Sequence, residues 1–275
     1  MQLIKKQKEC HMIQKSIEAL VSSLTKDERI IAVGLSSHPI PQKPDEGDID
    51  LFIYCSVIPE DRERIALYPE IVKDHEQFQC SIMDDAHWGL ADFTHLNGIE
   101  AWIMYFMKDK ESHNFEDIFN GLVFSRCNGF YPTGRLAMYK NMSILFEREP
   151  YLSQFKKRVQ TYPPKLKDVI MKSAREELCD EEDLRRGAVR KDLVFFHWVL
   201  DNALDAFMQY AYALNDELFP GRKRNLEQVA DFSLIPQNIS QRVKDMIRLA
   251  SHEETLQEAC TAFFALRDEM IKEKI

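Results

Sequence analysis

The stretch "VGLSSHPIPQKPDEGDIDLFIY", Val33 to Tyr54, decides the fold of the first half of this chain. An apolar run ends in the turn Leu35-Ser36-Ser37, and a second apolar run begins around the two acids Asp48 and Asp50. Short apolar runs bounded by turn residues are typical of buried strands. Residues two apart in a strand point to the same side, which sets the Cα atoms of the two acids about 6–7 Å apart. The stretch therefore predicts strands over 29–35 and 48–57, with paired carboxylates at the start of the second.

Paired carboxylates of this kind need a partner of opposite charge. Two neighbouring carboxylates repel each other, and one takes up a proton unless a cation holds them together. Mg²⁺ prefers carboxylate oxygens and leaves coordination positions for phosphate. The serine turn upstream can direct backbone N–H groups and hydroxyls at an anion. An anion seat followed by metal-binding carboxylates favours phosphoryl or nucleotidyl transfer, although an Asp-x-Asp taken alone is more often an exposed loop edge.

The composition narrows the class of protein. A chain of 275 residues forms one large domain or two smaller ones. Its formal charge of −9 argues against a nucleic-acid or membrane-surface partner, although the basic clusters 185–186 and 222–224 leave an anionic small ligand open. The sequence has no long apolar run, no signal-peptide core and six scattered cysteines. We therefore expect a cytoplasmic protein with reduced thiols.

The chain changes character near residue 160. Before it, helical spacing over 7–24 and 59–72 mixes with strand patterns over 78–83, 99–106 and 143–146, and Asn97-Gly98 is typical of a hairpin turn. After Pro163-Pro164 nearly everything has helical spacing, ending in a helix from Ser251 with a capping box to Glu254. These patterns predict an α+β protein. A mixed β-sheet with flanking helices occupies 1–160, and an all-α bundle occupies 161–275.

The quoted stretch resembles the signature of the polymerase-beta-type nucleotidyltransferase superfamily, in which a strand and a Gly-Ser turn precede an Asp-x-Asp pair. Ser37 matches the serine of the turn, "GDIDLFIY" is close to the family's "SDIDL" strand, and "NGIEAWIMYF" supplies Glu100 as the third carboxylate. Within the superfamily the chain is similar to bacterial kanamycin and lincosamide nucleotidyltransferases, which carry a C-terminal helical bundle. The stretch "ALNDELFPGRK", 213–223, resembles a helix-end motif of uncharacterised nucleotidyltransferase-like proteins.

This resemblance implies Mg²⁺-dependent transfer of a nucleoside monophosphate from ATP or another nucleoside triphosphate to a hydroxyl of a small molecule, with release of pyrophosphate. The catalytic and metal-binding residues would be Asp48, Asp50 and Glu100, with Glu100 completing a two-metal site or acting as base toward the acceptor hydroxyl. The implied nucleotide-binding residues are Ser36, Ser37, Asn215, Arg222 and Lys223. The acceptor, the nucleotide and the oligomeric state are not readable from the sequence.

Several alternatives stay open. Leu35-Ser36-Ser37 stands where the family has Gly-Gly-Ser or Gly-Ser, so a non-catalytic nucleotide-binding or antitoxin-like regulatory protein of the same fold is a second hypothesis. Glu100 alone is also consistent with an exposed strand residue, and "FPGRK" with a plain helix stop. The row His197, Asp201 and Asp205 is interpreted either as the lining of a cleft or, more commonly, as a solvated helix face. Phe93 and Trp102 are interpreted as packing residues.

Overall fold

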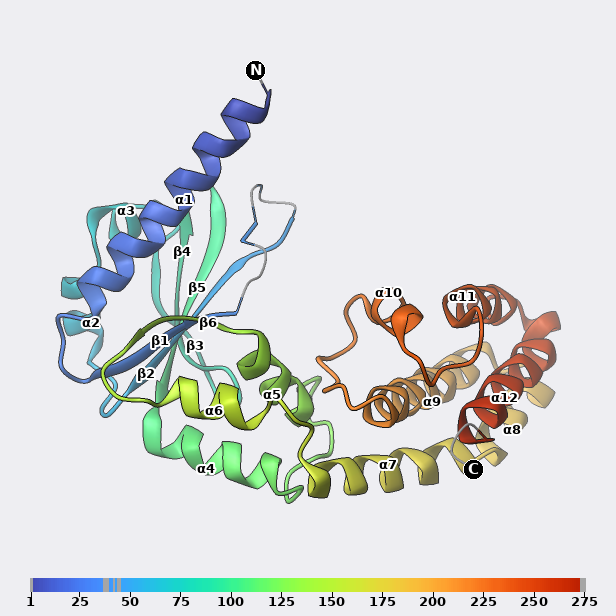
Figure 1. Ribbon diagram of the computed structural model, residues 1–275. Helices are drawn as coiled ribbons and strands as arrows, with labels where there is room; N and C mark the ends of the chain where they lie inside the picture. The colour runs from blue at the N-terminus through green and yellow to red at the C-terminus, as the bar shows by residue number, and fades with distance from the viewer. Residues whose placement is uncertain (1, 37–39, 42, 44–45, 273–275) are drawn as a thin grey trace. The chain divides into compact units, whose positions relative to one another are not determined.

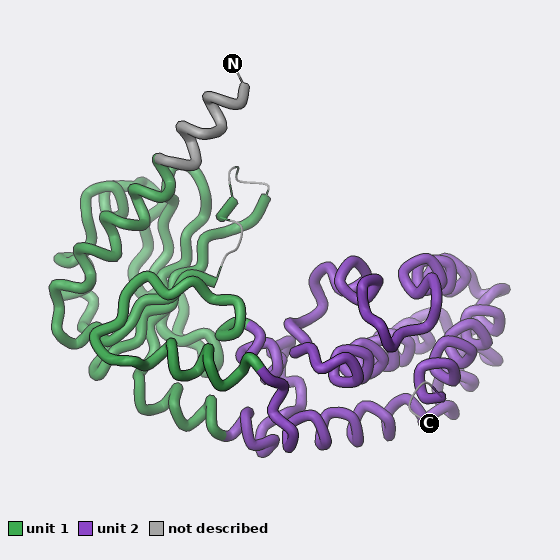
Figure 2. Tube along the Cα trace, in the orientation of Figure 1, with its two compact units in different colours: residues 1–116, 138–160 green, residues 117–137, 161–275 purple. Residues whose placement is uncertain are grey.

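The computed structural model describes residues 2–36, 40–41, 43 and 46–272, with the backbone alone for residues 2–11. The chain divides into two compact units (Figures 1 and 2). Unit 1 comprises residues 1–116 and 138–160, and unit 2 comprises residues 117–137 and 161–275. The domain ranges 1–160 and 161–275 remain a prediction, and the compact units differ from them in segment 117–137, which belongs with the helical unit.

Unit 1 is built on a six-stranded sheet in the order β3-β4-β5-β2-β1-β6. Strands β2 and β5 run parallel, and every other neighbouring pair is antiparallel. The sheet is therefore mixed and, with its flanking helices, confirms the predicted α+β class. The strands are β1 Ile30–Leu35, β2 Ile49–Cys55, β3 Gln79–Asp85, β4 Gly89–Leu96, β5 Ile99–Met107 and β6 Ser143–Glu147.

The predicted hairpin is present between β4 and β5. Leu96 pairs with Ile99, and the turn residues Asn97 and Gly98 have φ angles of 52° and 80°. Positive φ at both central positions is the geometry of a type I′ turn, which Asn-Gly adopts with little strain. This turn fixes the register of β5, the strand that carries Glu100.

One face of the sheet is covered by the N-terminal helices. These are α1 Gln2–Leu24, α2 Asp61–Leu67 and α3 Glu70–Lys73 (Figure 1). Alternate β2 residues, Leu51 and Ile53, pack into the same buried cluster as Ile17 and Leu20 of α1. Burying each such side chain contributes about 1.5–3 kcal/mol. We call this side of the sheet the core face. The prediction of one helix over 59–72 is wrong, because Pro69 disfavours helical backbone at Tyr68 and separates α2 from α3.

Helices and aromatic side chains cover the opposite face of the sheet at the end where Tyr54 and Phe106 lie. There, Tyr54 and Phe106 stack at 5.6 Å between ring centroids, and Tyr54 also packs on Tyr139 and Tyr151. Tyr139 lies on α5, and Phe155 of α6 packs against both tyrosines. All of these rings are buried. The helices on this side are α4 Lys108–Phe119, α5 Pro132–Asn141 and α6 Leu152–Arg158.

Unit 2 is helical. Its helix α7 begins at Pro164, as the break at Pro163-Pro164 predicts, because proline is tolerated in the first helical turn. The expected last helix is present as α12, but its predicted start and capping box at Ser251 are wrong: the Ser251 hydroxyl donates to the Ile247 carbonyl, and α12 begins at Leu256. The elements are α7 Pro164–Cys179, α8 Glu182–Arg190, α9 Leu193–Leu214, α10 Asn225–Gln228, η1 Val229–Asp231, α11 Ile239–Leu249, η2 Glu253–Thr255 and α12 Leu256–Lys272.

Two expectations from composition concern the whole chain. Among the residues described, none of the helices has both the length and the apolar character that a membrane span requires. The five cysteines whose side chains are described are free, and two of them, Cys55 and Cys260, are buried.

Candidate functional site

The acid pair lies where β2 enters the sheet. Along β2, Ile49, Leu51 and Ile53 are fully buried on the core face, whereas Asp50 between them points to the opposite face and is half-buried. Asp48 precedes the strand by one residue and is also half-buried. The alternation that buries the isoleucines therefore directs the Asp50 carboxylate away from the apolar core.

Ser36 is bonded directly to this acid. Its backbone N–H donates to the Asp50 carbonyl at 3.1 Å, and its hydroxyl donates to the Asp50 Oδ2 at 3.3 Å. The first bond continues the antiparallel pairing of β1 with β2, so the serine after β1 comes to lie opposite the acid on β2. Ser36 thus orients the carboxylate, and its single hydroxyl proton is engaged there. Ser37, the serine that matches the family turn, lies outside the described residues.

Glu100 lies on the strand beside β2. The parallel register sets Asp50 opposite Trp102 and Ile49 opposite Ala101. Glu100 is two residues before Trp102, so it shares the face of Asp50, and the same register continued by one residue sets it beside Asp48. The Glu100 side chain is exposed. Ser36, Asp48, Asp50 and Glu100 therefore gather at one end of one sheet face, which we call the acidic sheet end.

The acidic sheet end suits a hard cation only in part. Within the described residues, no group of three or more His, Cys, Asp or Glu side chains is arranged to hold a metal ion. The donor chemistry nevertheless fits Mg²⁺, which proteins commonly bind through one or two carboxylates while substrate phosphates and water complete the shell. The acid pair supplies such ligands. Metal binding by Asp48, Asp50 and Glu100 stays a prediction.

A row of rings continues from the acids across the neighbouring strands. The Phe93 and Trp102 rings lie 4.9 Å apart between centroids, Phe93 meets His95 at 5.2 Å, and His95 stacks on His75 at 4.9 Å. All four rings are half-buried. Strand register pairs Phe93 with Trp102 and His95 with Glu100, which sets the rings of Phe93, His95 and Trp102 on the face of the acids. This aromatic row was not predicted as a functional feature, since it depends on cross-strand pairing; only the hairpin turn hints at it.

Gly34, just before the serine turn, is explained by packing. A Cβ atom at Gly34 would lie 2.1 Å from the Met142 sulfur, far inside van der Waals contact. The space beside this glycine is therefore filled by a buried methionine of unit 1. In the family signature a glycine at the turn permits close approach by phosphates. Here the nearest glycine serves the fit between β1 and Met142.

Two predicted nucleotide-binding residues of unit 2 have partners inside that unit. The Asn215 amide donates to the Ala211 and Leu234 carbonyls at 2.8 and 2.9 Å, and its oxygen accepts from the Leu234 N–H at 2.8 Å. Asn215 thus closes the end of α9 and fixes the segment that returns beside it. Lys223 is exposed. The nucleotide-binding roles of both residues stay predictions.

Arg222 belongs to a cluster of charged and phenolic groups. Its Nη1 donates to both Asp201 oxygens at 2.8 and 2.7 Å, and its Nε donates to Asp205 at 2.9 Å and to the Tyr131 hydroxyl at 2.7 Å. Tyr131 in turn donates to Asp205 at 2.5 Å. Burial opposes the charged guanidinium, but its hydrogen bonds to Asp201 and Tyr131 and the charge of Asp205 outweigh this effect and raise the pKa of Arg222. A nucleotide-binding role for Arg222 stays a prediction and would require some of these bonds to break.

The same cluster corrects the interpretation of His197, Asp201 and Asp205 on α9 as a solvated helix face. Asp205 is buried, so the interpretation of 197, 201 and 205 as one solvated face is wrong for it. Burial of Tyr131, followed by its hydrogen bond to Asp205, raises the pKa of that phenol. No local pattern predicts this contact, because Tyr131 lies 74 residues away along the chain from Asp205. The cluster therefore joins segment 117–137 to the helices of unit 2.

Comparison with known proteins adds one structural likeness. No protein-family model matches the chain, and no curated protein matches it. The chain is similar to the crystal structure of a nucleotidyltransferase-like protein from Exiguobacterium sibiricum, with 12% identity and a TM-score of 0.49, over 94% of this chain and 77% of that chain. The α+β architecture itself rests on the described sheet and helices.

Proposed function

We propose that the acidic sheet end of unit 1 binds a divalent cation together with a nucleoside triphosphate, and that the chain transfers a nucleoside monophosphate to a hydroxyl of a small molecule. The observation that carries this proposal is the pair of hydrogen bonds between Ser36 and Asp50. Those bonds set Ser36 beside Asp50, the second acid of the Asp-x-Asp pair, at one end of the sheet.

In the proposed reaction the protein forms no covalent bond to the substrate; its side chains position the reactants and stabilise charge. The acceptor oxygen attacks the α-phosphorus, the bond from that phosphorus to the bridging oxygen of the β-phosphate breaks, and pyrophosphate leaves with the electron pair. Mg²⁺, when bound, supplies neutralisation of the charge that develops on the phosphate oxygens. Asp48 and Asp50 hold the cation, and Ser36 fixes the orientation of the second acid. Glu100 accepts the proton of the acceptor hydroxyl or adds a ligand to the cation.

The aromatic row gives this site a second surface. Every nucleobase has a π-face, and stacking on an aromatic side chain contributes about 1–3 kcal/mol per base. Trp102 lies directly across from Asp50 in the strand register. We propose that a planar group of the nucleotide or of the acceptor stacks on this row. The antibiotic-modifying type of acceptor belongs to the same proposal.

A non-catalytic, nucleotide-binding or regulatory role is the second candidate, and one observation favours it. The turn lacks the family glycine, Gly34 is explained by the packing of Met142, and the Ser36 hydroxyl is engaged with Asp50. A turn of this kind offers fewer free donors to a transferred phosphate. In this role the chain binds a nucleotide but does not transfer a nucleoside monophosphate.

Release of pyrophosphate separates the two candidates. The chain is incubated with Mg²⁺ and each of the four common ribonucleoside triphosphates, across a panel of aminoglycoside, lincosamide and sugar hydroxyl acceptors. Transfer predicts acceptor-dependent pyrophosphate, lost in Asp50→Asn and kept in Asp84→Asn, a matched change at an exposed β3 acid. Saturable nucleotide binding without pyrophosphate for any acceptor supports the regulatory candidate. Release that persists in Asp50→Asn rules out this site.

Assays of unit 2 variants test the remaining predicted contacts. Lys223→Gln removes one exposed positive charge and leaves the partners of Arg222 in place. If Lys223 contacts a phosphate, the Kd for nucleotide rises about tenfold, since a charged hydrogen bond contributes about 1.5–3 kcal/mol. An unchanged Kd assigns "FPGRK" to the helix-stop interpretation.

A further inference from the structure

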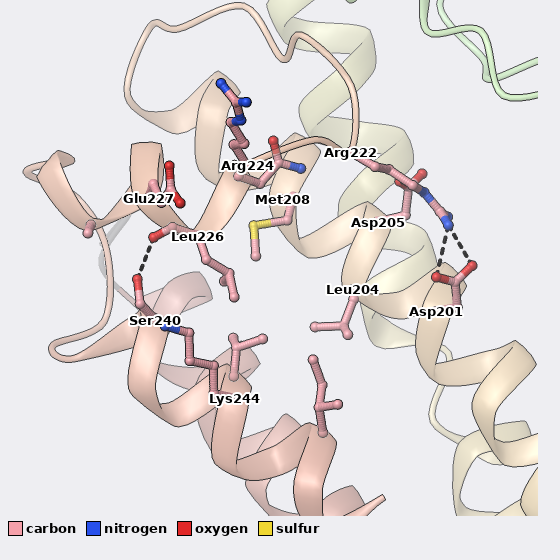
Figure 3. A pocket seen from close by; sticks show the side chains of 14 residues that line it. Asp201, Leu204, Asp205, Met208, Arg222, Arg224, Leu226, Glu227, Ser240 and Lys244 are labelled. Atoms are coloured by element: carbon pink, nitrogen blue, oxygen red, sulfur yellow. Dashed lines mark hydrogen bonds and ion pairs between the residues drawn. The ribbon is translucent and has the colours of Figure 1, made fainter. Parts of the chain in front are cut away.

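Unit 2 contains a cavity that the proposed transfer reaction does not use. Its volume is about 560 Å³, and its walls come from α9, from the segment 222–230 and from α11 (Figure 3). Small-molecule sites in proteins occupy about 300–1,000 Å³. The cavity therefore has the size of a ligand site and lies entirely within the helical unit.

The walls of this cavity are mostly apolar. Leu204 and Met208 on α9 and Leu226 on the intervening segment direct their side chains into it (Figure 3). Val243 and Ile247 of α11 complete this surface, and Ile247 is 43% exposed to solvent. An apolar side chain left in contact with water at a concave surface favours an apolar occupant, because binding removes that side chain from water.

The charges at the α9 side of the cavity are already paired. Asp201 and Asp205 both bind Arg222, and the Arg126 guanidinium lies 3.7 Å from Asp205. Two acids thus face two arginines, with a formal charge of zero. This side of the cavity offers little net attraction to a charged ligand.

The charges at the α10 and α11 side are different. Arg224 and Lys244 line the cavity, and within the part of the chain that the structure describes neither side chain makes an ion pair or a hydrogen bond. Glu227 is the remaining acid of the lining, so two cations face one anion here. Figure 3 shows the Lys244 side chain extending toward Ser240. The Ser240 hydroxyl donates its hydrogen bond to the Leu226 carbonyl at 2.5 Å. The unpaired ammonium is therefore available to an anionic group.

From these features we propose that the cavity binds a small amphipathic organic anion. The apolar body of the ligand packs against Leu204, Met208, Leu226 and Ile247, and its carboxylate or phosphate head binds Lys244, with Arg224 adding long-range attraction. This ligand site belongs to unit 2, whereas the acidic sheet end belongs to unit 1, and the proposal does not depend on nucleotidyl transfer.

Three ten-carbon ligands that differ only in the head group test the ligand class. Decanoate, decan-1-ol and decylamine are titrated into the full chain by calorimetry, below the concentrations at which they form micelles. We expect saturable one-to-one binding of decanoate with a Kd below about 1 mM, and binding at least about fivefold weaker for the alcohol and the amine. Inorganic phosphate, which lacks the apolar body, should not bind measurably at the same concentrations.

Matched variants test the proposed contacts. Lys244→Gln should weaken decanoate about tenfold, because a hydrogen bond to a charged group is lost. Lys244→Arg should restore binding to within about threefold, since it keeps the charge. Lys172→Gln, an exposed lysine of α7 outside the cavity, should leave the Kd unchanged. Ile247→Trp, at a partly exposed position, should fill the mouth and weaken all three ligands without threatening the fold.

The results that overturn the proposal are equally specific. Decylamine binding as tightly as decanoate contradicts an anion site. Equal decanoate binding by wild type and Lys244→Gln removes the assigned head-group contact. Decanoate binding that is unsaturable, or unchanged in Ile247→Trp, places the ligand elsewhere on the protein. Circular dichroism of each variant identifies any loss of fold before these comparisons are made.

Discussion

Asp92 of β4 is the acceptor at the centre of a buried polar network in unit 1, and its removal gives the sharpest test of the described packing. It is 0% exposed and accepts from Arg64 Nε at 2.9 Å, from Arg64 Nη2 at 3.0 Å, from the Ser81 N–H at 2.7 Å and from the Tyr68 hydroxyl. Arg64 is itself only 1% exposed. Asp92→Ala would leave a buried guanidinium without its buried counter-charge.

The size of the effect follows from what Arg64 keeps. Breaking a buried ion pair by removing one partner typically destabilises by about 3–5 kcal/mol. Arg64 retains the Pro59 carbonyl at 2.8 Å, the neutral Ser81 hydroxyl at 2.7 Å and Asp61 at 3.0 Å, but Asp61, the charged partner among them, is 59% exposed. We therefore expect Asp92→Ala to cost about 4 kcal/mol. The control Asp61→Asn removes the exposed partner of the same arginine and should cost less than about 1 kcal/mol.

Hydrogen exchange measured by mass spectrometry resolves the two units separately. In Asp92→Ala the most protected amides of β4 and β5 should exchange about three orders of magnitude faster, which is 4 kcal/mol at 1.4 kcal/mol per tenfold change. Protection in α9 of unit 2 serves as the internal reference. An acceleration no larger than that in Asp61→Asn would refute the reasoning, because the pair would then contribute no more than a surface contact.

Two further predictions concern the packing of Gly34 and the dependence of the stability of unit 1 on pH. Gly34→Ala should lower the free energy of unfolding, measured in urea, by about 2 kcal/mol, because the added Cβ collides with Met142. In a Met142→Ala background the cost of the same substitution should fall below about 0.5 kcal/mol. Equal costs in both backgrounds would contradict this contact. The side-chain hydrogen bonds from Arg29 lower the pKa of Asp27 in the folded protein. Ionised Asp27 therefore stabilises unit 1 at pH values above its unfolded pKa of 3.8, and this stabilisation is lost as the pH falls through the lower folded pKa. Asp27→Asn should therefore give a flatter stability curve between about pH 5 and pH 2 in denaturant titrations, and a slope equal to that of the wild type would count against the assignment.

Local patterns predicted the parts of the fold that rest on local chemistry. The apolar runs at β1 and β2 and the Asn97-Gly98 turn are confirmed, since each depends on neighbouring residues. Strand β4 was not predicted, because its core face carries the polar residues Asp92 and Thr94, both 0% exposed. Their partners, Arg64 and the Val72 carbonyl, come from helices 22–28 residues earlier. The sequence of β4 shows no alternation of apolar and polar residues, because polar side chains with distant partners take the place of apolar ones on its core face.

The candidate site shows the same division. Asp48 and Asp50 could be selected from residue type and spacing, because the period of a strand sets their direction, whereas Glu100 was selected through the resemblance to the nucleotidyltransferase superfamily. The bond between Ser36 and Asp50 and the ring row beside Trp102 depend on which strands become neighbours. That order, β3-β4-β5-β2-β1-β6, is not sequential, and the chain offers no local signal for it.

Binding of Mn²⁺ with a non-hydrolysable nucleotide tests the central claim most directly. Electron paramagnetic resonance reports the metal, and calorimetry reports the nucleotide, in the wild type, Asp50→Asn and the exposed-acid control Asp84→Asn. The account predicts joint binding of metal and nucleotide by the wild type and the control, and a Kd at least about tenfold higher for Asp50→Asn. Equal affinity in Asp50→Asn, or no binding by the wild type at millimolar nucleotide, would contradict a cation site at the acidic sheet end.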